Sequence, residues 1–142
     1  IWQPQHERGF VAERGAGAWL LAGGSRERLT CAPPSEETES WRGITSRWSW
    51  VGRELPGLAP LELTWVCCGV DYPHLIAGDA DFAVYRRVSP WDHVPGSLLV
   101  EESGGALGSF GGQPFTPLLD HDLIVATSAA VLAHVQHAVA SA

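Results

Sequence analysis

Asp92 is the residue whose type and setting point most directly to chemistry. It follows a short apolar run, Phe82–Tyr85, and a tight loop, and it stands at the start of a segment with helical periodicity. A carboxylate held at a helix N-terminus is a well-placed hard oxygen ligand for Mg²⁺, and the helix dipole there favours a nearby phosphate group. The same pattern also fits an aspartate that only caps its own helix. The pattern alone leaves both interpretations open.

Two further groups of residues carry atoms that could react or bind a metal. Cys67 and Cys68 are adjacent and fit either reactive thiols or packing residues at a helix start. His134 and His137 lie on neighbouring positions of one helix face, but a metal site would need a third ligand. We therefore interpret the histidine pair as structural.

Three tryptophans, Trp41, Trp48 and Trp50, gather in the middle of the sequence. Aromatic rings at such spacing fit a platform for a sugar or a partner, and they also fit core or interface packing, which is the commoner use.

The elements that must position these residues follow from apolar periodicity and turn signals. We predict strands at 10–13, 18–21, 29–31, 41–45, 61–66, Phe82–Tyr85, 106–110 and Leu123–Ala126. We predict helices at 46–55, at 69–77 with Pro73 in the first turn and Gly78 as the stop, from Trp91-Asp92 to Gly104-Gly105, and from Thr127 or Ser128 to about Ala140. Because strands and helices alternate after residue 40, the pattern predicts a layered α/β arrangement.

Residues 32–39 form a Pro-rich, acidic connector, which we take as a boundary. The predicted domains are 1–39, the end of an antiparallel β-sheet plus the connector, and 40–142, an α/β domain.

Composition excludes several classes of protein. The 142 residues carry 9 basic and 16 acidic side chains, a net charge of −7, which argues against a nucleic-acid partner. Apolar residues at 45% and charged residues at 18% are typical of a globular domain. Residues 123–140 are largely apolar, but a strand followed by an amphipathic helix explains them better than a membrane span. Three cysteines without metal-type spacing favour a reducing, cytoplasmic compartment.

The sequence contains no Met and opens at Ile1 without the features of a signal peptide. We therefore expect a mature or excised segment of a longer protein.

Several blocks, in order along the chain, resemble the inositol monophosphatase family. Trp91-Asp92-x-x-x-Gly96, followed by an apolar helix and Glu102-x-Gly104-Gly105, resembles the family's C-terminal signature. The segments 11–19, 77–82 and 105–126 resemble its Ala-Glu-x-Gly-x-Gly hairpin, its Ala-x-Gly-x-x-Asp segment and its closing section. The resemblance implies a layered αβ sandwich of the inositol monophosphatase and fructose-1,6-bisphosphatase type, of which this chain is the C-terminal part.

The resemblance also implies roles for particular residues. Asp92 would ligate a catalytic Mg²⁺ beside the reacting phosphate ester, which metal-activated water attacks. Val66, Cys67 and Cys68 would line the substrate, at the family's Gly-Ser/Thr-Ala turn. Tyr85 would lie where inositol-cleaving members often carry a substrate-binding Glu. The family's members are commonly homodimers, which the resemblance extends to this protein.

The sequence departs from the family pattern at the substrate positions. Tyr85 replaces the Glu, and a phenol cannot accept hydrogen bonds from a polyol's hydroxyl groups as a carboxylate does. Val66 replaces the usual Gly, whereas Pro95 for Ala is a mild change in the first helical turn. Arg86-Arg87 would favour a more anionic substrate, such as a nucleotide or sugar phosphate, or they are two solvent-exposed arginines.

The family's remaining metal ligands, a Glu and an Asp-Pro-Ile/Leu-Asp-Gly-Thr/Ser loop, are absent. Neither 69–73 nor 119–122 fits that loop. In the family these residues precede the hairpin that begins here at residue 11, so we expect them on a missing N-terminal half. Because metal-assisted hydrolysis needs a cluster of carboxylates, we expect this chain alone to be inactive.

Two hypotheses follow. The first is the C-terminal portion of a Mg²⁺-dependent phosphomonoesterase that acts on a small phosphorylated substrate. The second is a non-catalytic fragment or divergent homologue that binds a ligand or a partner.

Overall fold

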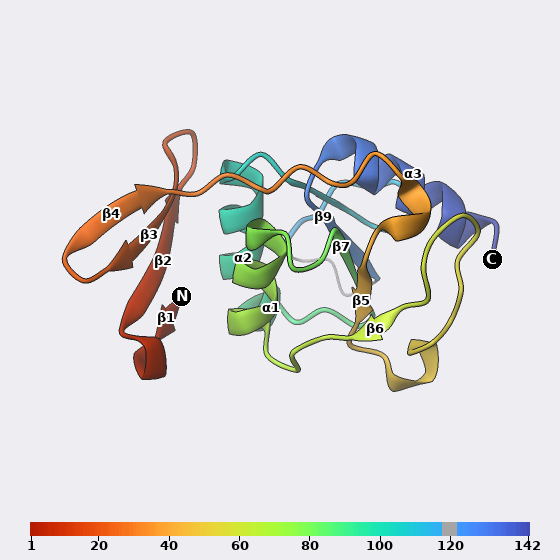
Figure 1. Cartoon of the computed structure of the whole chain (residues 1–142), viewed down its shortest axis with the longest axis horizontal. Coiled ribbons are helices and arrows are strands. Elements are labelled where there is room, and N and C mark those ends of the chain that lie inside the picture. Colours follow the sequence, from red (N-terminus) through yellow and green to blue (C-terminus); the bar gives the residue numbers. More distant parts are fainter. Residues whose placement is uncertain (118–121) are drawn as a thin grey trace.

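The computed structural model describes residues 1–117 and 122–142, which form two sheets with helices between and beyond them. Figure 1 shows the order of the layers: an antiparallel sheet, then helices α1 (Cys68–Ala77) and α2 (Pro90–Glu102), then a second sheet, then helix α3 (Ala129–Ala140). This is the layered αβ arrangement that the sequence predicts.

The first sheet is an antiparallel meander with the strand order β1-β2-β3-β4. Its strands are β1 (Trp2–Gln3), β2 (Arg8–Glu13), β3 (Gly17–Ala22) and β4 (Ser25–Arg28), with a short 3₁₀ helix, η1 (Pro4–His6), between the first two.

The second sheet is mixed, with the order β6-β5-β7-β9-β8. Its strands are β5 (Gly43–Thr45), β6 (Glu62–Leu63), β7 (Phe82–Tyr85), β8 (Ala106–Gly108) and β9 (Leu123–Ala126). Strands β6, β5 and β7 run parallel, whereas β9 is antiparallel to β7 and to β8. The carboxyl ends of β5, β6 and β7 therefore meet at one edge of the sheet.

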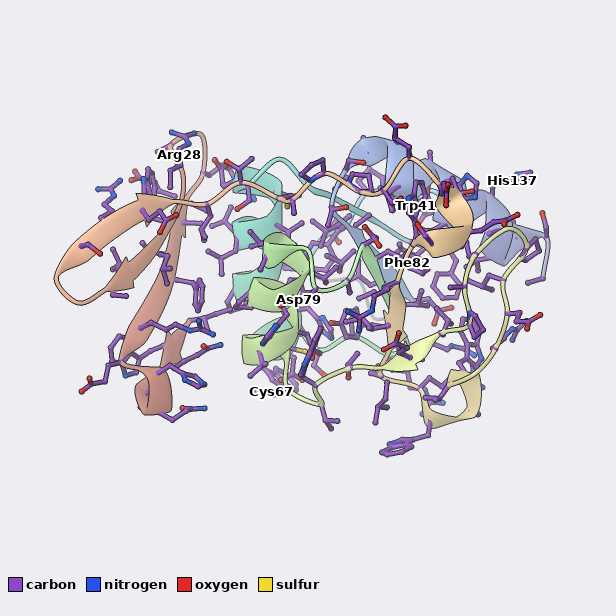
Figure 2. All side chains as sticks on the ribbon, viewed as in Figure 1. Arg28, Trp41, Cys67, Asp79, Phe82 and His137 are labelled. Atoms are coloured by element: carbon purple, nitrogen blue, oxygen red, sulfur yellow. The ribbon has the colours of Figure 1, made fainter. Side chains whose placement is uncertain are left out.

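Helices cover both faces of the second sheet, which explains its continuous apolar strands. On β7, Ala83 and Tyr85 belong to the core shared with α1, α2 and the first sheet, whereas Phe82 and Val84 belong to the core under α3. Side chains fill the space between the layers, as Figure 2 shows around Phe82.

The predicted strand at 29–31 is wrong, because the strand lies earlier, at Ser25–Arg28. Gly23 and Gly24 both adopt positive φ and form a two-residue hairpin turn, so β4 pairs at once with β3. All four β4 residues are exposed, so the strand lacks the apolar alternation that reveals a half-buried strand.

The predicted helix at 46–55 is also wrong. Only a 3₁₀ turn, η3 (Trp48–Trp50), forms there; another 3₁₀ turn, η2 (Thr38–Ser40), precedes β5. Gly52 has φ +77° and its N–H donates to the Leu61 carbonyl, so the backbone bonds across a loop instead of along a helix. Leu55, Leu58 and Leu61 still enter the core, as packing residues of that loop.

Helix α1 ends at Gly78 as predicted, with φ +87° at that glycine. Because the helix begins at Cys68, Pro73 lies in its second turn, not in the first. Proline lacks the N–H that would bond the carbonyl of Gly69 four residues earlier. The side-chain amide of Gln3 on β1 donates to that carbonyl instead, at 2.7 Å. This bond also ties the first sheet to α1.

Helix α2 begins one residue earlier than predicted, with Ser89 at the N-cap position and Pro90 as its first residue. Asp92 lies in the first turn but makes no capping hydrogen bond, so the interpretation of Asp92 as a plain cap is wrong. Pro95 consequently falls in the second turn. In α3, the Ser128 hydroxyl accepts from the Val131 N–H, as predicted for a cap.

Within residues 1–117 and 122–142, none of the helices combines the length and the apolar character that a membrane-crossing segment needs. Most of the segment 119–122 lies outside the described residues.

Candidate functional site

A cavity of about 500 Å³ opens where the parallel strands end. Ser46 follows β5, Leu63 and Thr64 lie at the end of β6, and Tyr85 ends β7, and all four residues line this cavity. We call it the main pocket. In open α/β sheets ligands bind in the crevice at the carboxyl ends of the strands, so the topology itself marks this position.

Two helix N-termini border the same pocket. Cys68 and Gly69 open α1, whereas Trp91, Asp92 and His93 belong to the first turn of α2. The first N–H groups of a helix have no acceptor within the helix, and the helix dipole places positive partial charge there. The pocket therefore offers two sites of the kind that bind a phosphate.

The pocket brings together all five residues to which the family resemblance assigns a site role. Val66, Cys67 and Cys68 lie on the turn into α1, Tyr85 lies at the end of β7, and Asp92 lies in the first turn of α2. They come from three separate parts of the chain. The geometry thus joins them at one place, and their roles stay predictions.

Val66 has a backbone conformation that L-residues rarely adopt. Its φ is +60°, in the left-handed region, and its side chain is 70% exposed. A β-branched residue is strained there, whereas glycine is not. The backbone here thus suits the glycine that the resemblance implies at this position better than the valine present.

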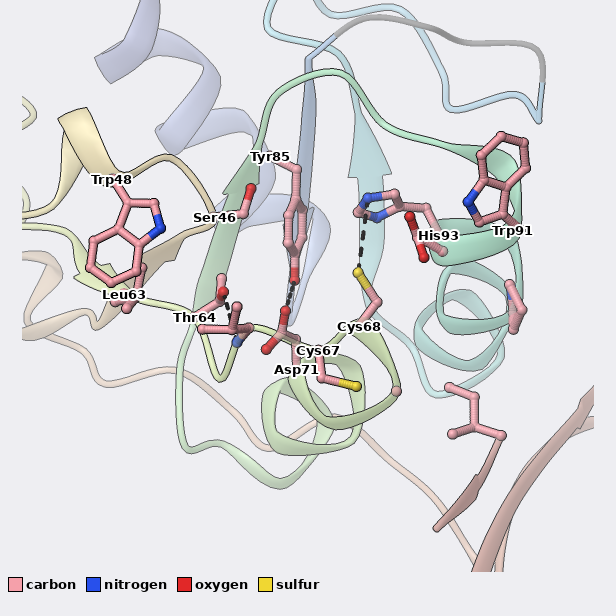
Figure 3. Close-up of a pocket in the computed structure, with 15 residues that line it drawn as sticks. Ser46, Trp48, Leu63, Thr64, Cys67, Cys68, Asp71, Tyr85, Trp91 and His93 are labelled. Atoms are coloured by element: carbon pink, nitrogen blue, oxygen red, sulfur yellow. Dashed lines mark hydrogen bonds between the residues drawn. The ribbon is translucent and has the colours of Figure 1, made fainter.

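Asp71 is a pocket residue that the sequence reasoning missed. Its buried carboxylate accepts a hydrogen bond from the Tyr85 hydroxyl at 3.1 Å (Figure 3) and another from the Trp65 N–H at 2.9 Å. Burial raises the pKa of Asp71, and these two donors oppose part of that shift. Tyr85 is therefore held in place by a carboxylate from α1. The only sequence signal for Asp71 is its position, four residues after Cys67.

His93 is the second residue that was missed. Its Nδ1 lies 2.8 Å from the Tyr72 hydroxyl. Its Nε2 lies 4.0 Å from the Cys68 sulfur (Figure 3). Burial lowers the pKa of His93, and the neighbouring Asp92 opposes that shift. Burial also raises the pKa of Cys68 to about 12, so its thiol stays protonated and packs against the core. This supports packing for Cys68 over the reactive-thiol interpretation.

The three central tryptophans take different positions. Trp41 is buried with its ring edge-on to His134, and Trp50 stacks on Phe110. Trp48 is exposed at the main pocket, on the side opposite Trp91 (Figure 3). Core packing thus holds for Trp41 and Trp50. The ring contact of His134 supports a structural role for that histidine.

The donor groups do not by themselves fit the Mg²⁺ ion that the resemblance implies. Among residues 1–117 and 122–142, no three His, Cys, Asp or Glu side chains converge as metal ligands. Two carboxylates line the pocket, but that of Asp71 already accepts hydrogen bonds from Tyr85 and Trp65, so among the described residues only Asp92 offers a lining carboxylate outside such bonds. A single carboxylate does not fix a Mg²⁺ ion, which requires six oxygen ligands.

Two of the motif blocks are joined by a direct contact. The Glu102 carboxylate, at the end of α2, accepts hydrogen bonds from the Gly15 and Gly17 N–H groups at 2.7 and 2.9 Å. Gly15 lies in the turn between β2 and β3, and Gly17 is the first residue of β3. The Glu-x-Gly-Gly and Ala-Glu-x-Gly-x-Gly motifs therefore build one structural tie that fixes α2 against the first sheet.

The glycine of the Trp-Asp motif has a packing role. A Cβ on Gly96 would lie 2.2 Å from the Tyr72 ring, so only glycine allows α2 to approach α1 this closely. The N-termini of the two helices are thereby brought to the same pocket.

Solved structures define the class of fold. The structure of inositol monophosphatase from Anabaena (Nostoc) sp. PCC 7120 superposes with a TM-score of 0.77 at 21% identity, covering 99% of this chain and 60% of that chain. The extragenic suppressor protein suhB from Bartonella henselae gives a TM-score of 0.80 at 20% identity, over 99% and 57%. The fold is the layered αβ sandwich of these proteins.

Sequence comparison then gives the family. The model of the inositol monophosphatase family matches residues 1–141. The inositol-1-monophosphatase of Bacillus subtilis (strain 168) is 27% identical over 135 residues, which cover 87% of this chain and 48% of that protein. The chain belongs to the inositol monophosphatase family. It spans about half the length of this curated relative.

Proposed function

We propose that this chain forms part of a Mg²⁺-dependent phosphomonoesterase that hydrolyses a small phosphate monoester. The observation that carries the proposal is the convergence of Asp92 and the α1 and α2 N-termini on one pocket. Family membership supports the reaction class.

The described residues would bind and orient the ester. Backbone N–H groups at Cys68 and Gly69 would donate to phosphate oxygens, because these residues open a helix and line the pocket. The turn Val66-Cys67-Cys68 would line the alcohol portion of the substrate, with Tyr85 beneath it. Asp92 would supply one oxygen ligand to the Mg²⁺ ion.

The remaining metal ligands would come from a polypeptide that corresponds to the N-terminal half of the family's members. We propose that the chain alone is therefore inactive and that this half is its partner. The sequence encoded before Ile1 tests the point directly. A Glu and an Asp-Pro-x-Asp-Gly loop are expected there, and a coding sequence that begins at Ile1 would contradict the proposal.

The competing function is a binding module without catalysis. The lack of a three-ligand metal cluster among the described residues favours it. Activity separates the two, since a binding module releases no phosphate from any ester.

Phosphate release by the protein, as its gene encodes it, tests the proposal. We expect Mg²⁺-dependent turnover of at least one ester among inositol, histidinol, sugar and nucleotide monophosphates. Asp92→Asn should abolish that turnover and leave the fold intact. Asp79→Asn is the matched control, because Asp79 is an exposed carboxylate outside the main pocket. Full turnover by Asp92→Asn would show that Asp92 is no ligand.

Cytoplasmic location and a homodimer stay predictions. The three cysteines are free thiols, which supports a reducing compartment.

A further inference from the structure

We infer that the main pocket has a second, cationic subsite, formed by Arg47, Arg86 and Arg87, for an additional anionic group on the substrate. These three arginines and Ser46 line a separate hollow of about 340 Å³. Ser46 also lines the main pocket, so the two cavities adjoin at this residue. The inference rests on the proposed function, because it extends the substrate from the main pocket into this hollow.

The topology of the sheet explains why the arginines meet. Arg47 lies two residues after β5, and Arg86-Arg87 follow β7 directly. Strands β5 and β7 are parallel neighbours, with Thr45 opposite Val84, so their following loops leave the sheet side by side. This is the same sheet edge that carries the main pocket.

The charges in this hollow are mostly of one sign. The Arg86 Nε donates to the Asp122 Oδ1 at 2.7 Å, which pairs one of the three guanidinium groups. Arg47 donates to the Ser49 hydroxyl at 2.9 Å and lies 5.3 Å from the Trp50 ring centre, and neither contact is with an anion. A chain with a net charge of −7 thus places three of its nine arginines at one hollow. Their mutual repulsion is relieved when an anion binds between them.

The backbone at Arg87 adds a second observation. Its φ is +59°, so a long side chain stands at a position where glycine would be unstrained. Strained backbone of this kind gathers at ligand sites, where the surrounding structure maintains it. Three non-glycine residues in the described chain have positive φ. One of them, Val66, lines the main pocket, and another, Arg87, lines this hollow.

The substrate class that follows is a phosphate ester with a second phosphate, sulfate or carboxylate group. Guanidinium groups bind each of these through charge-assisted, often paired hydrogen bonds.

Two titrations of the ¹⁵N-labelled chain test the subsite. In the first, inorganic sulfate is added and the Nε–H resonances of the arginines are followed. Arg47 and Arg87 should shift, whereas Arg28, on the distant antiparallel sheet (Figure 2), should not. If Arg47 and Arg87 do not shift, or if Arg28 shifts as much, the subsite does not exist.

The second titration compares glucose 6-phosphate with glucose 1,6-bisphosphate at low salt. We expect the bisphosphate to bind about tenfold more tightly, the gain of one good charge-assisted contact. The double variant R47Q/R87Q should reduce that ratio to about one, whereas R28Q/R26Q, with the same change of net charge on β4, should retain it. An unchanged ratio in R47Q/R87Q, or an equal loss in the β4 control, would overturn the inference.

The two titrations also separate this inference from the proposed function. If sulfate shifts Arg47 and Arg87 but glucose 6-phosphate leaves the Cys68 and Gly69 amides unmoved, the subsite stands and the phosphate site proposed for the main pocket fails. If glucose 6-phosphate shifts those amides but the bisphosphate binds no better, the phosphate site stands and the subsite fails.

Discussion

At the scale of single residues, the site combines a strained backbone with buried polar groups. Val66 is held at positive φ on the rim, while Asp71 and His93 are buried in the floor and make hydrogen bonds to tyrosines. Each of these features costs free energy locally, and the packing of α1 against α2 maintains them. Substitutions at these residues can therefore change stability in either direction.

Val66→Gly should stabilise the chain. Glycine removes a strain of about 1–2 kcal/mol at φ +60° and loses less than that in backbone entropy, while the exposed valine side chain gives up little burial. We expect a gain of about 0.5–1 kcal/mol in the free energy of unfolding, measured by urea denaturation.

Val51→Gly is the matched control, because Val51 is 43% exposed but has φ −59°. It should destabilise the chain by about 0.5–1 kcal/mol. Equal effects at the two positions would refute the strain at Val66.

His93 should make the free energy of unfolding depend on pH below about 6.5. Burial lowers its pKa in the folded chain below the ordinary 6.5, so the unfolded chain binds more protons once the pH drops below that value. Stability is thus lost as pH falls from 6.5 through the lowered pKa, and not above 6.5. Denaturation midpoints between pH 4 and 8 should show a smaller loss in His93→Gln than in the wild type. His6→Gln, which removes an exposed imidazole, should retain the wild-type loss. An identical pH profile for His93→Gln would contradict this account.

At the scale of elements, the site depends on how α2 is fixed. Gly96, in the middle of α2, lets this helix approach α1. Glu102, the last residue of α2, accepts hydrogen bonds from Gly15 and Gly17 at the β2–β3 connection. These contacts set the position of the first turn of α2, which carries Asp92. Motif residues in the middle and at the C-terminal end of α2 thus position the Asp92 carboxylate.

Glu102→Ala should loosen this tie. It leaves the Gly15 and Gly17 N–H groups without their carboxylate, and we expect a loss of about 2 kcal/mol in the free energy of unfolding. Glu101→Ala is the control, since Glu101 makes only an exposed ion pair with Arg14 at 3.6 Å and should cost less than about 0.5 kcal/mol. Thermal denaturation of both variants measures the difference. Similar losses would show that Glu102 is an ordinary surface carboxylate.

Secondary structure could be predicted where one physical signal dominates. Phe82–Tyr85 and Leu123–Ala126 are apolar on every residue because helices cover both sheet faces, and Gly78 ends α1 because it adopts the left-handed conformation. The loop at 46–55 is predicted as a helix because apolar residues such as Trp50 and Leu55 recur in it; they pack into the core through tertiary contacts, which local periodicity does not record.

The site could be predicted only in part. Asp92, Val66, Cys67, Cys68 and Tyr85 stand in recognisable motifs, and they do line one pocket. Asp71 and His93 were missed because their importance lies in hydrogen bonds to Tyr85 and Tyr72, on other elements. Such pairings depend on three-dimensional packing and leave no local pattern.

At the scale of the whole molecule, two sheets enclose a helical layer whose N-termini meet the carboxyl ends of parallel strands (Figure 1). The division into domains at residue 39 stays a prediction, and the core of α1 and α2 includes Phe10 and Ala18 of the first sheet. The arrangement places a pocket at one sheet edge, where Asp92 and the hydrogen-bonded Asp71 supply the lining carboxylates. Under the proposed function, the described residues would bind the substrate and the remaining metal ligands would come from another polypeptide segment.

The most direct test of this central claim uses Mn²⁺ as a paramagnetic probe for the Mg²⁺ position. With inorganic phosphate present, Mn²⁺ should broaden the amide resonances of Asp92, Cys68 and Gly69 in the ¹⁵N-labelled chain. The effect should be weak and need high metal concentration, because the Asp71 carboxylate is already hydrogen-bonded to Tyr85 and Trp65 and Asp92 offers the other lining carboxylate. Asp92→Asn should remove that broadening. Broadening that persists in Asp92→Asn, or that centres on residues outside the main pocket, would contradict the assignment of Asp92 as a metal ligand beside a phosphate site.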